Sequence, residues 1–388
     1  MSGKLTCTLQ DVKQVVRKHL LLDDYRIVDI ILAVVVANLI KTDPLWLLII
    51  GASSTAKTEL LGGLDGLAMT HFISDLTTNT LISGKKDASL LLKLNKKIMV
   101  MKDFTTVLSK RPDDLKIIMG HLREVYDGKL SKSYGTGDTV DWEGHVGFIG
   151  ACTPVYDRKH SVISQMGERF LLYRNTNKDD IKSGMQALSG FGSERTMRSE
   201  LKNIFEEFIT QFKGANIEAP ELSEDMQYQI VSLATLCGHG RCSVHRDPYH
   251  RDEITYMPEP EGSPRLSKQL YHLRIGLMAV MGEKEITEDI YSILCRVGSD
   301  LIPRLRFKII KYLWDSRAFL ETGKIFSTTE VASGTELNGK TVLRTLQDMG
   351  VIGLTKGELV ENDQGKPFVW RLTEKAVRLI GASQVFDD

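Results

Sequence analysis

A short segment near residue 50 has the residue types and spacing of a phosphate-binding loop. Residues 51–58 read GASSTAKT, between the continuous apolar run LWLLII and the amphipathic segment ELLGGLDGLAM. Backbone N–H groups at this position can point at an anion, a lysine can reach the β and γ phosphates of a nucleotide, and a threonine hydroxyl can ligate Mg²⁺. A chance turn is the alternative, but the buried strand, the helix and the Lys-Thr pair together favour phosphate binding. The candidate ATP-binding residues are Gly51, Ser53, Ser54, Thr55, Ala56, Lys57 and Thr58.

The residues of this loop also resemble those of a known family. The usual loop has glycine where this chain has Ala56, and the string TAKTELL resembles the loop of MCM-type replicative helicases, which are AAA+ ATPases. The resemblance covers roughly residues 20 to 300 and is to the short versions carried by bacteria, phages or mobile elements. It implies an α/β P-loop AAA+ core with a parallel sheet and flanking helices, an α-helical lid and a C-terminal winged helix. It also implies ATP and Mg²⁺ as cofactors and assembly into a homo-oligomer, typically a hexameric ring.

The second nucleotide motif departs from the family pattern. An apolar strand at residues 97–101 ends in Lys102-Asp103-Phe104, where the family has Asp-Glu-Phe. Alignment on the phenylalanine puts Lys102 at the Mg²⁺-binding aspartate and Asp103 at the catalytic glutamate, whereas alignment on the aspartate leaves Phe104 in place of the glutamate. One carboxylate is therefore missing, and Asp103 is the candidate both for holding the metal and for polarising water. A site that binds ATP but turns it over slowly or not at all stays open as an alternative, because binding and chemistry depend on different groups.

Three more family motifs follow in the expected order. Thr153 ends the apolar strand at residues 145–151 and matches the first sensor, which contacts the γ-phosphate or the attacking water; a plain strand-ending threonine is the alternative. Arg169, in the string MGERFL, matches the arginine that reaches the ATP of a neighbouring subunit, and Arg174 is the second candidate. Arg265, in the string SPRL, matches the second sensor. Asp103, Arg169, Thr153 and Arg265 are thus the candidate catalytic residues.

Two segments could bind DNA. Residues 123–137 match the family's hairpin before the first sensor, and Lys129, Lys132 and Tyr134 would suit backbone phosphates and base stacking. An ordinary solvated hairpin is the alternative. Near the C-terminus, residues 338–345 form the expected recognition helix of a winged helix, with Lys340 and Arg344 on its outer face. Such a domain can instead bind proteins or pack on its own ring.

The hydrophobic pattern predicts three parts of the chain. Strands and helices alternate through residues 1–177, helical periodicity dominates residues 178–303, and residues 304–388 read as three helices followed by a hairpin at residues 351–373. We expect helices at residues 10–24 and 26–40, and a long loop at residues 247–265. The parts correspond to the nucleotide-binding core, the lid with the second-sensor helix, and the winged helix.

Composition narrows the function classes further. The 388 residues carry 50 Lys+Arg and 50 Asp+Glu, so no global charge drives binding to nucleic acid or membrane and a DNA-binding surface must be local. The five cysteines are odd in number and scattered, and no signal peptide is evident, so we expect a reducing cytoplasm and no membrane partner. The string CGHGRCSVH at residues 237–245 fits no common zinc knuckle; a basic loop near nucleotide or DNA is the favoured interpretation.

The sequence therefore predicts a ring-forming ATPase that translocates on DNA, unwinds it or opens an origin, together with other replication or mobile-element proteins. A nucleotide-gated DNA-binding or scaffold protein with weak or no hydrolysis is the second hypothesis. An ATP-dependent transcription regulator is the third, and it depends on the winged helix alone.

Overall fold

The chain divides into two compact units. The computed structural model describes residues 6–83, 89–135, 138–165, 167–176, 179–217, 220–247, 249–250, 252–316, 325–359 and 368–387. The first unit comprises Met1–Pro220 and His272–Ile293, and the second comprises Glu221–Tyr271 and Leu294–Asp388. The boundaries that the sequence suggests at residues 177 and 303 stay predictions.

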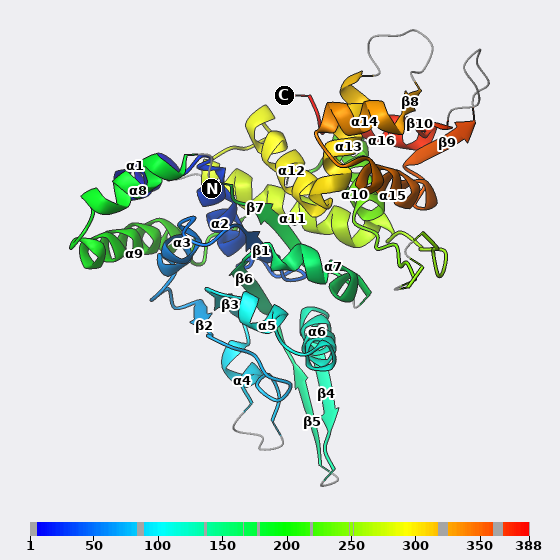
Figure 1. Ribbon diagram of the computed structural model, residues 1–388. Helices are drawn as coiled ribbons and strands as arrows, with labels where there is room; N and C mark the ends of the chain where they lie inside the picture. Colours follow the sequence, from blue (N-terminus) through cyan, green and yellow to red (C-terminus); the bar gives the residue numbers. More distant parts are fainter. Residues whose placement is uncertain are drawn as a thin grey trace. The chain divides into compact units, whose positions relative to one another are not determined.

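A five-stranded parallel sheet forms the centre of the first unit (Figure 1). All its neighbouring strands pair in parallel. This confirms the predicted α/β class and the three predicted strands, while the two strands at the sheet edges were not predicted. In spatial order the strands are β2 (Thr70–Phe72), β3 (Lys97–Met101), β6 (Val146–Cys152), β1 (Trp46–Ile50) and β7 (Phe170–Arg174).

Aromatic side chains fill the core under this sheet. All five residues of β1 are buried, and the Trp46 ring lies 5.3–5.5 Å from the rings of Tyr126, Phe148 and Phe170. The Trp46 indole donates a hydrogen bond to the Val146 carbonyl at 2.7 Å, so its polar atom is satisfied inside the core. Strand β1 is therefore held firmly at the place where the loop that follows it begins.

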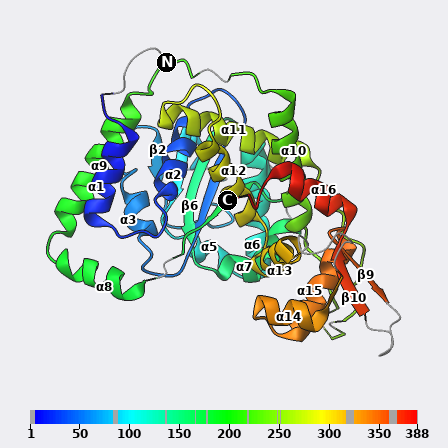
Figure 2. The same ribbon diagram turned by 90° about the horizontal axis from the view of Figure 1, so that it is seen from above.

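Helices cover both faces of the sheet (Figure 2). On the face of α2, the helix α11 passes so close that a Cβ at Gly276 would lie 2.2 Å from the Ala33 carbonyl oxygen, so only glycine fits there. The sequence predicted a helix at residues 10–24, but this helix ends at His19, and Leu20 is already extended. On one face lie α1 (Leu9–His19), α2 (Arg26–Ala37), α3 (Lys57–Gly62) and α9 (Glu194–Thr210); on the other lie α5 (Thr105–Leu108), α6 (Pro112–Tyr126) and α7 (Val155–Gln165). The short helix α4 (Leu91–Leu94) precedes β3.

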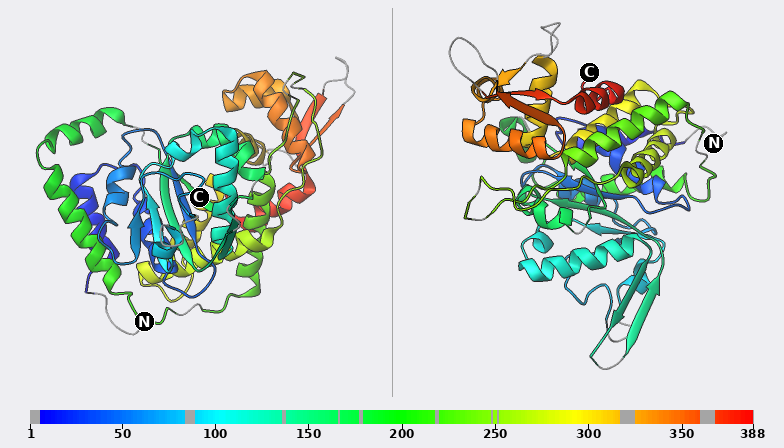
Figure 3. Two further views of the ribbon diagram at one scale, coloured as in Figure 1. Left: turned by 90° about the horizontal axis from the view of Figure 1, so that it is seen from below. Right: turned by 90° about the vertical axis from the view of Figure 1, so that its right-hand side faces the viewer.

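A two-stranded hairpin leaves the sheet between α6 and β6. Its strands, β4 (Lys129–Ser133) and β5 (Thr139–Glu143), pair antiparallel and extend away from the five-stranded sheet (Figures 1 and 3). The predicted hairpin at this place is therefore present, apart from residues 136–137, which lie outside the described ranges.

The second unit is helical with a small antiparallel sheet (Figure 3, right). Strands β9 and β10 confirm the predicted C-terminal hairpin, whose residues 360–367 lie outside the described ranges, and β8 was not predicted. The described elements are α10 (Glu224–Gly240), α13 (Arg304–Asp315), β8 (Phe326–Ser327), α14 (Thr328–Thr335), α15 (Gly339–Val351), β9 (Thr355–Leu359), β10 (Phe368–Leu372) and α16 (Glu374–Ser383). Two helices, α11 (Ser263–Met281) and α12 (Glu288–Leu301), contribute residues to both units.

Local sequence signals explain where the C-terminal helices begin. The Ser327 side chain accepts from the Glu330 amide and the Glu330 carboxylate accepts from the Ser327 amide, which is a complete capping box. Asn338 caps α15 and Thr373 caps α16 through their side-chain oxygens. Each cap satisfies an amide that would otherwise lack an intrahelical partner.

Acid should destabilise the second unit through His239. Its Nδ1 donates to the Ile352 carbonyl at 2.7 Å, and its Nε2 accepts from the Lys375 ammonium at 2.8 Å, an arrangement that needs the neutral ring. Burial lowers the pKa of His239 and the Lys375 charge lowers it further, although the Ile352 carbonyl opposes the shift. Because the folded pKa lies below the unfolded value of about 6.5, this contribution is complete above that pH and is lost as pH falls toward the folded value.

Thermal unfolding measured between pH 7.5 and 5.5 checks this prediction. We expect His239→Gln to lose less stability on acidification than wild type. Equal pH dependence in wild type and His239→Gln would contradict the assignment.

Among the described residues, no helix is both long and apolar enough to cross a membrane.

Candidate functional site

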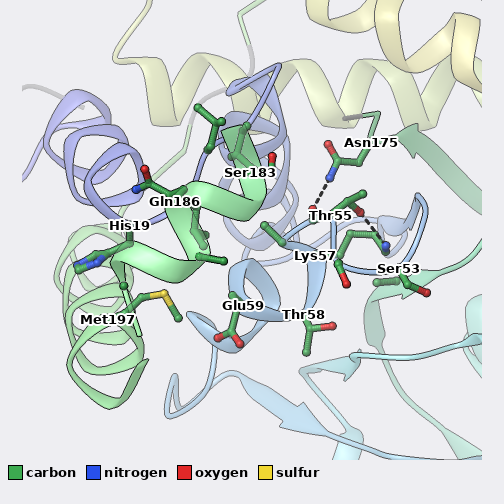
Figure 4. Close-up of a pocket in the computed structure, with 18 of the residues that line it drawn as sticks. His19, Ser53, Thr55, Lys57, Thr58, Glu59, Asn175, Ser183, Gln186 and Met197 are labelled. Carbon is green, nitrogen blue, oxygen red and sulfur yellow. Dashed lines mark hydrogen bonds between the residues drawn. The ribbon is translucent and has the colours of Figure 1, made fainter. Parts of the chain in front are cut away.

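A pocket of about 750 Å³ opens at the carboxyl ends of β1, β3 and β6, where polar loops follow the buried strands (Figure 4). Such edges are where open α/β sheets place their ligands. One wall is made by the loop after β1 and the ends of β3, β6 and β7. The opposite wall is made by α1 and the segment after it, α9, and α8 (Asp180–Ser189). The first wall is lined by residues 53–59, 102–103, 151–153 and 175–176.

The loop after β1 has the backbone conformation of an anion-binding nest. Ser54 and Ala56 both have left-handed backbones, with φ of 62° and 58°. Left-handed residues in such a turn direct successive backbone N–H groups into one concavity that can bind an anion. Ala56 occupies the position at which the usual loop has glycine, the residue that takes this conformation without strain.

Removing that strain should stabilise the protein. A left-handed backbone costs a residue with a Cβ roughly 1–2 kcal/mol, while glycine gives back part of this through the freedom it adds to the unfolded chain. We therefore expect Ala56→Gly to raise the free energy of unfolding by about 0.5–1 kcal/mol in chemical denaturation. The control Ala332→Gly, inside α14, should instead lower it by about 1 kcal/mol. A loss at both positions would contradict a strained Ala56.

Lys57 lies inside this loop and its side chain is 8% exposed. Its ammonium donates to the Gly51 carbonyl and the Thr55 hydroxyl, each at 2.9 Å, and also to the Ala52 carbonyl. Burial lowers its pKa, while Asp103 is one of the groups that raise it. These neutral oxygens hold the charge within the loop, where a phosphate entering the nest would meet it.

Asn175 fixes the loop from the neighbouring strand, and sequence analysis missed it. Its side-chain amide donates to the Thr55 carbonyl at 2.7 Å, and its backbone amide donates to the Ile50 carbonyl. A Cβ on Gly51 would lie 2.7 Å from the Asn175 carbonyl oxygen and 3.0 Å from the Thr55 hydroxyl oxygen, so Gly51 is needed for close approach rather than for an unusual φ. Asn175 is 4% exposed and follows β7, which the sequence pattern did not identify as a strand.

The predicted chemical groups after β3 and β6 line the same pocket. Asp103 accepts from the Thr105 amide at 2.9 Å, and the Thr105 hydroxyl accepts from the Thr153 amide at 3.0 Å. The turn after β3 is therefore hydrogen-bonded to the end of β6. Thr58 and Lys102 also line the pocket. Eight residues predicted from three motifs therefore line this pocket: Ser53, Ser54, Thr55, Ala56, Lys57, Thr58, Asp103 and Thr153.

The opposite wall was not predicted. Its polar side chains include His19 on α1, Ser183 and Gln186 on α8, and Ser193 before α9 (Figure 4). The Gln186 amide donates to the Lys18 carbonyl at 3.3 Å, which links α8 to the end of α1. The pocket of about 750 Å³ between the two walls has room for a ligand larger than inorganic phosphate.

The two arginine candidates are held by ion pairs. Arg169 pairs with Asp127 through two nitrogens, at 3.3 and 3.2 Å, and its guanidinium lies 5.5 Å from the Tyr126 ring centroid. Arg174 is almost fully buried and pairs with Asp157 at 2.8 and 2.9 Å. Of the residues that the structure describes, those lining the pocket include neither arginine.

Arg265 belongs to the second unit and pairs there with Glu261, which also pairs with Arg241. In the segment that invited a zinc interpretation, the Cys237 thiol donates to the Gly298 carbonyl and His239 is engaged as described above. Within the described ranges, no group of three or more His, Cys, Asp or Glu side chains is placed to hold a metal ion.

The predicted DNA-binding residues differ in exposure and in the contacts that their side chains already make within the protein. Lys129 is exposed and its ammonium lies 3.9 Å from Glu143 across the hairpin. Lys132 is engaged within its own unit, because it donates to the Thr78 carbonyl at 2.9 Å and to the Asn79 side chain at 2.8 Å, with its ammonium 5.4 Å from the Tyr134 ring centroid.

On α15, Lys340 is exposed in the first turn, and Arg344 pairs with the exposed Asp252 at 3.0 Å. The helix buries Val342 and Leu346 on its inner face, so Lys340 stays on the outer face that the sequence assigned to it.

No protein-family model matches this chain, and a search of curated proteins finds no significant match.

Proposed function

We propose that this protein binds ATP in the pocket after β1 and belongs to the MCM-like branch of AAA+ ATPases. The observation that carries the proposal is the loop Gly51–Thr58, which combines two left-handed residues with a buried lysine whose ammonium donates to three oxygens of that loop. Such a nest and ammonium suit the β and γ phosphates. The parallel sheet with flanking helices is compatible with this class of ATPase without being specific to it.

ATP hydrolysis is the second part of the proposal, and the groups around the loop support it. Water attacks the γ-phosphorus, the bond to the β–γ bridging oxygen breaks, and ADP and phosphate result. Asp103 or Thr153 would orient and polarise the water, and Thr58 with Asp103 would hold Mg²⁺, which commonly takes one or two protein ligands besides phosphate oxygens and water. Bound Mg²⁺ would neutralise charge on the phosphates.

Self-association is the next part of the proposal, and two features support it. Arg169 is rigidly held but does not line its own described pocket, so a neighbouring copy is the place where it would meet ATP. Helix α8 lines the pocket with one face and carries a row of large apolar side chains on the other, Ile181, Met185 and Leu188. Phe191 follows the end of the helix, and all four side chains are 67–85% exposed. A row of this size on one short helix favours burial against another molecule.

Charge on that row should prevent assembly. We expect Met185→Glu to weaken ATP-dependent association by at least about tenfold, because an unpaired carboxylate would enter an apolar contact. Asn203→Glu, which adds the same charge at an exposed site on α9, is the control and should assemble like wild type. Light scattering across a protein dilution series in ATP makes the comparison. Normal assembly of Met185→Glu would show that α8 is not part of the interface.

DNA is the proposed substrate of the assembled protein. The proposal is supported by two exposed lysines that could meet backbone phosphates, Lys129 on the projecting hairpin β4–β5 and Lys340 on the outer face of α15. The C-terminal helices and three-stranded antiparallel sheet are compatible with a winged helix, and the helical middle region with a lid.

A nucleotide-gated DNA-binding or scaffold protein is the second candidate, because Lys102 follows β3 where a motor would place a carboxylate. Phosphate release in excess ATP, with and without single-stranded DNA, separates the two. Turnover that DNA stimulates supports the motor, while ATP-dependent assembly without turnover supports the gated protein. No effect of ATP on either property would contradict both.

A further inference from the structure

Where residues 53–59 and 102–103 line the pocket, they place two lysines and two carboxylates there: Lys57, Lys102, Glu59 and Asp103. The Glu59 carboxylate is already paired with the Arg198 guanidinium at 2.7 and 2.9 Å, so it is compensated from α9. Two lysines therefore face one uncompensated carboxylate, and that carboxylate also accepts the Thr105 amide through Oδ1.

Lys102 follows β3 and lines the pocket beside Asp103. Its ammonium lies 5.1 Å from the Phe72 ring centroid, and 3.7 Å from where a Cβ on Gly62 would lie, so the side chain extends along β2 and the end of α3. Within the described part of the chain, no carboxylate forms a salt bridge with it. A contact with an aromatic face holds an exposed cation only weakly and so leaves it available for an anion.

We propose that Lys102 is a second phosphate-binding cation, so that this site holds the polyphosphate of ATP without requiring Mg²⁺. The inference rests on the proposed function. It adds a second phosphate-binding residue and the expectation that ATP binds without Mg²⁺. A carboxylate after β3 would repel the phosphates and need a divalent cation between them, whereas an ammonium attracts them directly. The Lys102 side chain would turn from Phe72 toward the loop to meet the phosphates, so that it and Lys57 would both contribute positive charge.

Equilibrium titration with a fluorescent ATP analogue, in excess Mg²⁺ and again in excess EDTA, tests the proposal. We expect the Kd of wild type to change by less than about threefold between the two conditions, and Lys102→Met to lose about tenfold in affinity in EDTA but clearly less in Mg²⁺. Lys102→Arg should keep metal-independent binding because it keeps the charge. Lys102→Asp should bind only in Mg²⁺. Lys116→Met removes an exposed lysine from α6 and should match wild type.

The outcomes separate this inference from the proposed function. If wild type binds the analogue only in Mg²⁺, or if Lys102→Met matches wild type in EDTA, Lys102 is not a phosphate-binding group, while ATP binding itself stands. If wild type binds in neither condition, the proposed function fails as well. Because the Lys102 side chain is exposed, these substitutions should leave folding unchanged, and a matching unfolding curve for each variant checks this.

Discussion

Replacing Arg169 by alanine should lower DNA-stimulated ATP turnover by about 1,000-fold and leave ATP affinity close to that of wild type. A guanidinium delivered to the γ-phosphate stabilises charge that develops only during phosphoryl transfer, so its loss reduces turnover rather than binding. The contacts of Arg169 suit this task. Two bonds to Asp127 and the ring of Tyr126 hold the side chain in a defined position next to β7. Phosphate release and analogue titration measure the two effects.

Two further experiments separate this role of Arg169 from a purely structural one. Asp127→Ala removes the same intrachain ion pair but keeps the guanidinium, so it should retain most of the turnover. Mixing Arg169→Ala with Asp103→Asn, which keeps Lys57 and the loop, should restore part of the activity, because some interfaces then combine an intact Asp103 with an intact arginine from the neighbour. Equal loss in Asp127→Ala and Arg169→Ala, with no recovery on mixing, would show that the arginine only supports its own subunit.

Replacing Lys57 by methionine should lower ATP affinity at least about 100-fold and abolish both assembly in ATP and turnover. The ammonium is a buried charge held by three oxygens of the loop, and a phosphate would add a charge-assisted hydrogen bond to it. Methionine has a similar length and no charge, so it removes this interaction with little change in volume. Lys116→Met is the matched control. ATP affinity that survives in Lys57→Met, with both variants folded, would show that the nucleotide binds elsewhere.

The sheet could be predicted only in its centre. Strands β1, β3 and β6 are continuous apolar runs that end at polar residues, a pattern typical of parallel strands buried on both faces. The edge strand β2 has three residues, THF, too few to show any period. The other edge strand, β7, is fully buried. Its residues FLLYR overlap the string MGERFL, which was interpreted as an arginine motif and not as the start of a strand.

The site could be predicted where its residues are contiguous and not where the fold brings them together. The loop Gly51–Thr58 carries its own signal, since strand, loop and lysine are adjacent in the chain. Asn175 lies 120 residues from Thr55 and reaches it only because β7 pairs with β1. Likewise, nothing in the hairpin sequence indicates that Lys132 is bound to the turn at Thr78 and Asn79.

Hydrogen exchange of the backbone amides in residues 52–58, with and without ATP, tests the central claim most directly. If the loop forms a nest around the phosphates, its amides become donors to them, and their exchange should slow clearly in ATP and much less in AMP. The slowing should extend to the turn from Asp103 to Thr105 and be absent in Lys57→Met. Unchanged exchange in residues 52–58 at an ATP concentration that saturates any binding would contradict the assignment of this loop as the phosphate site.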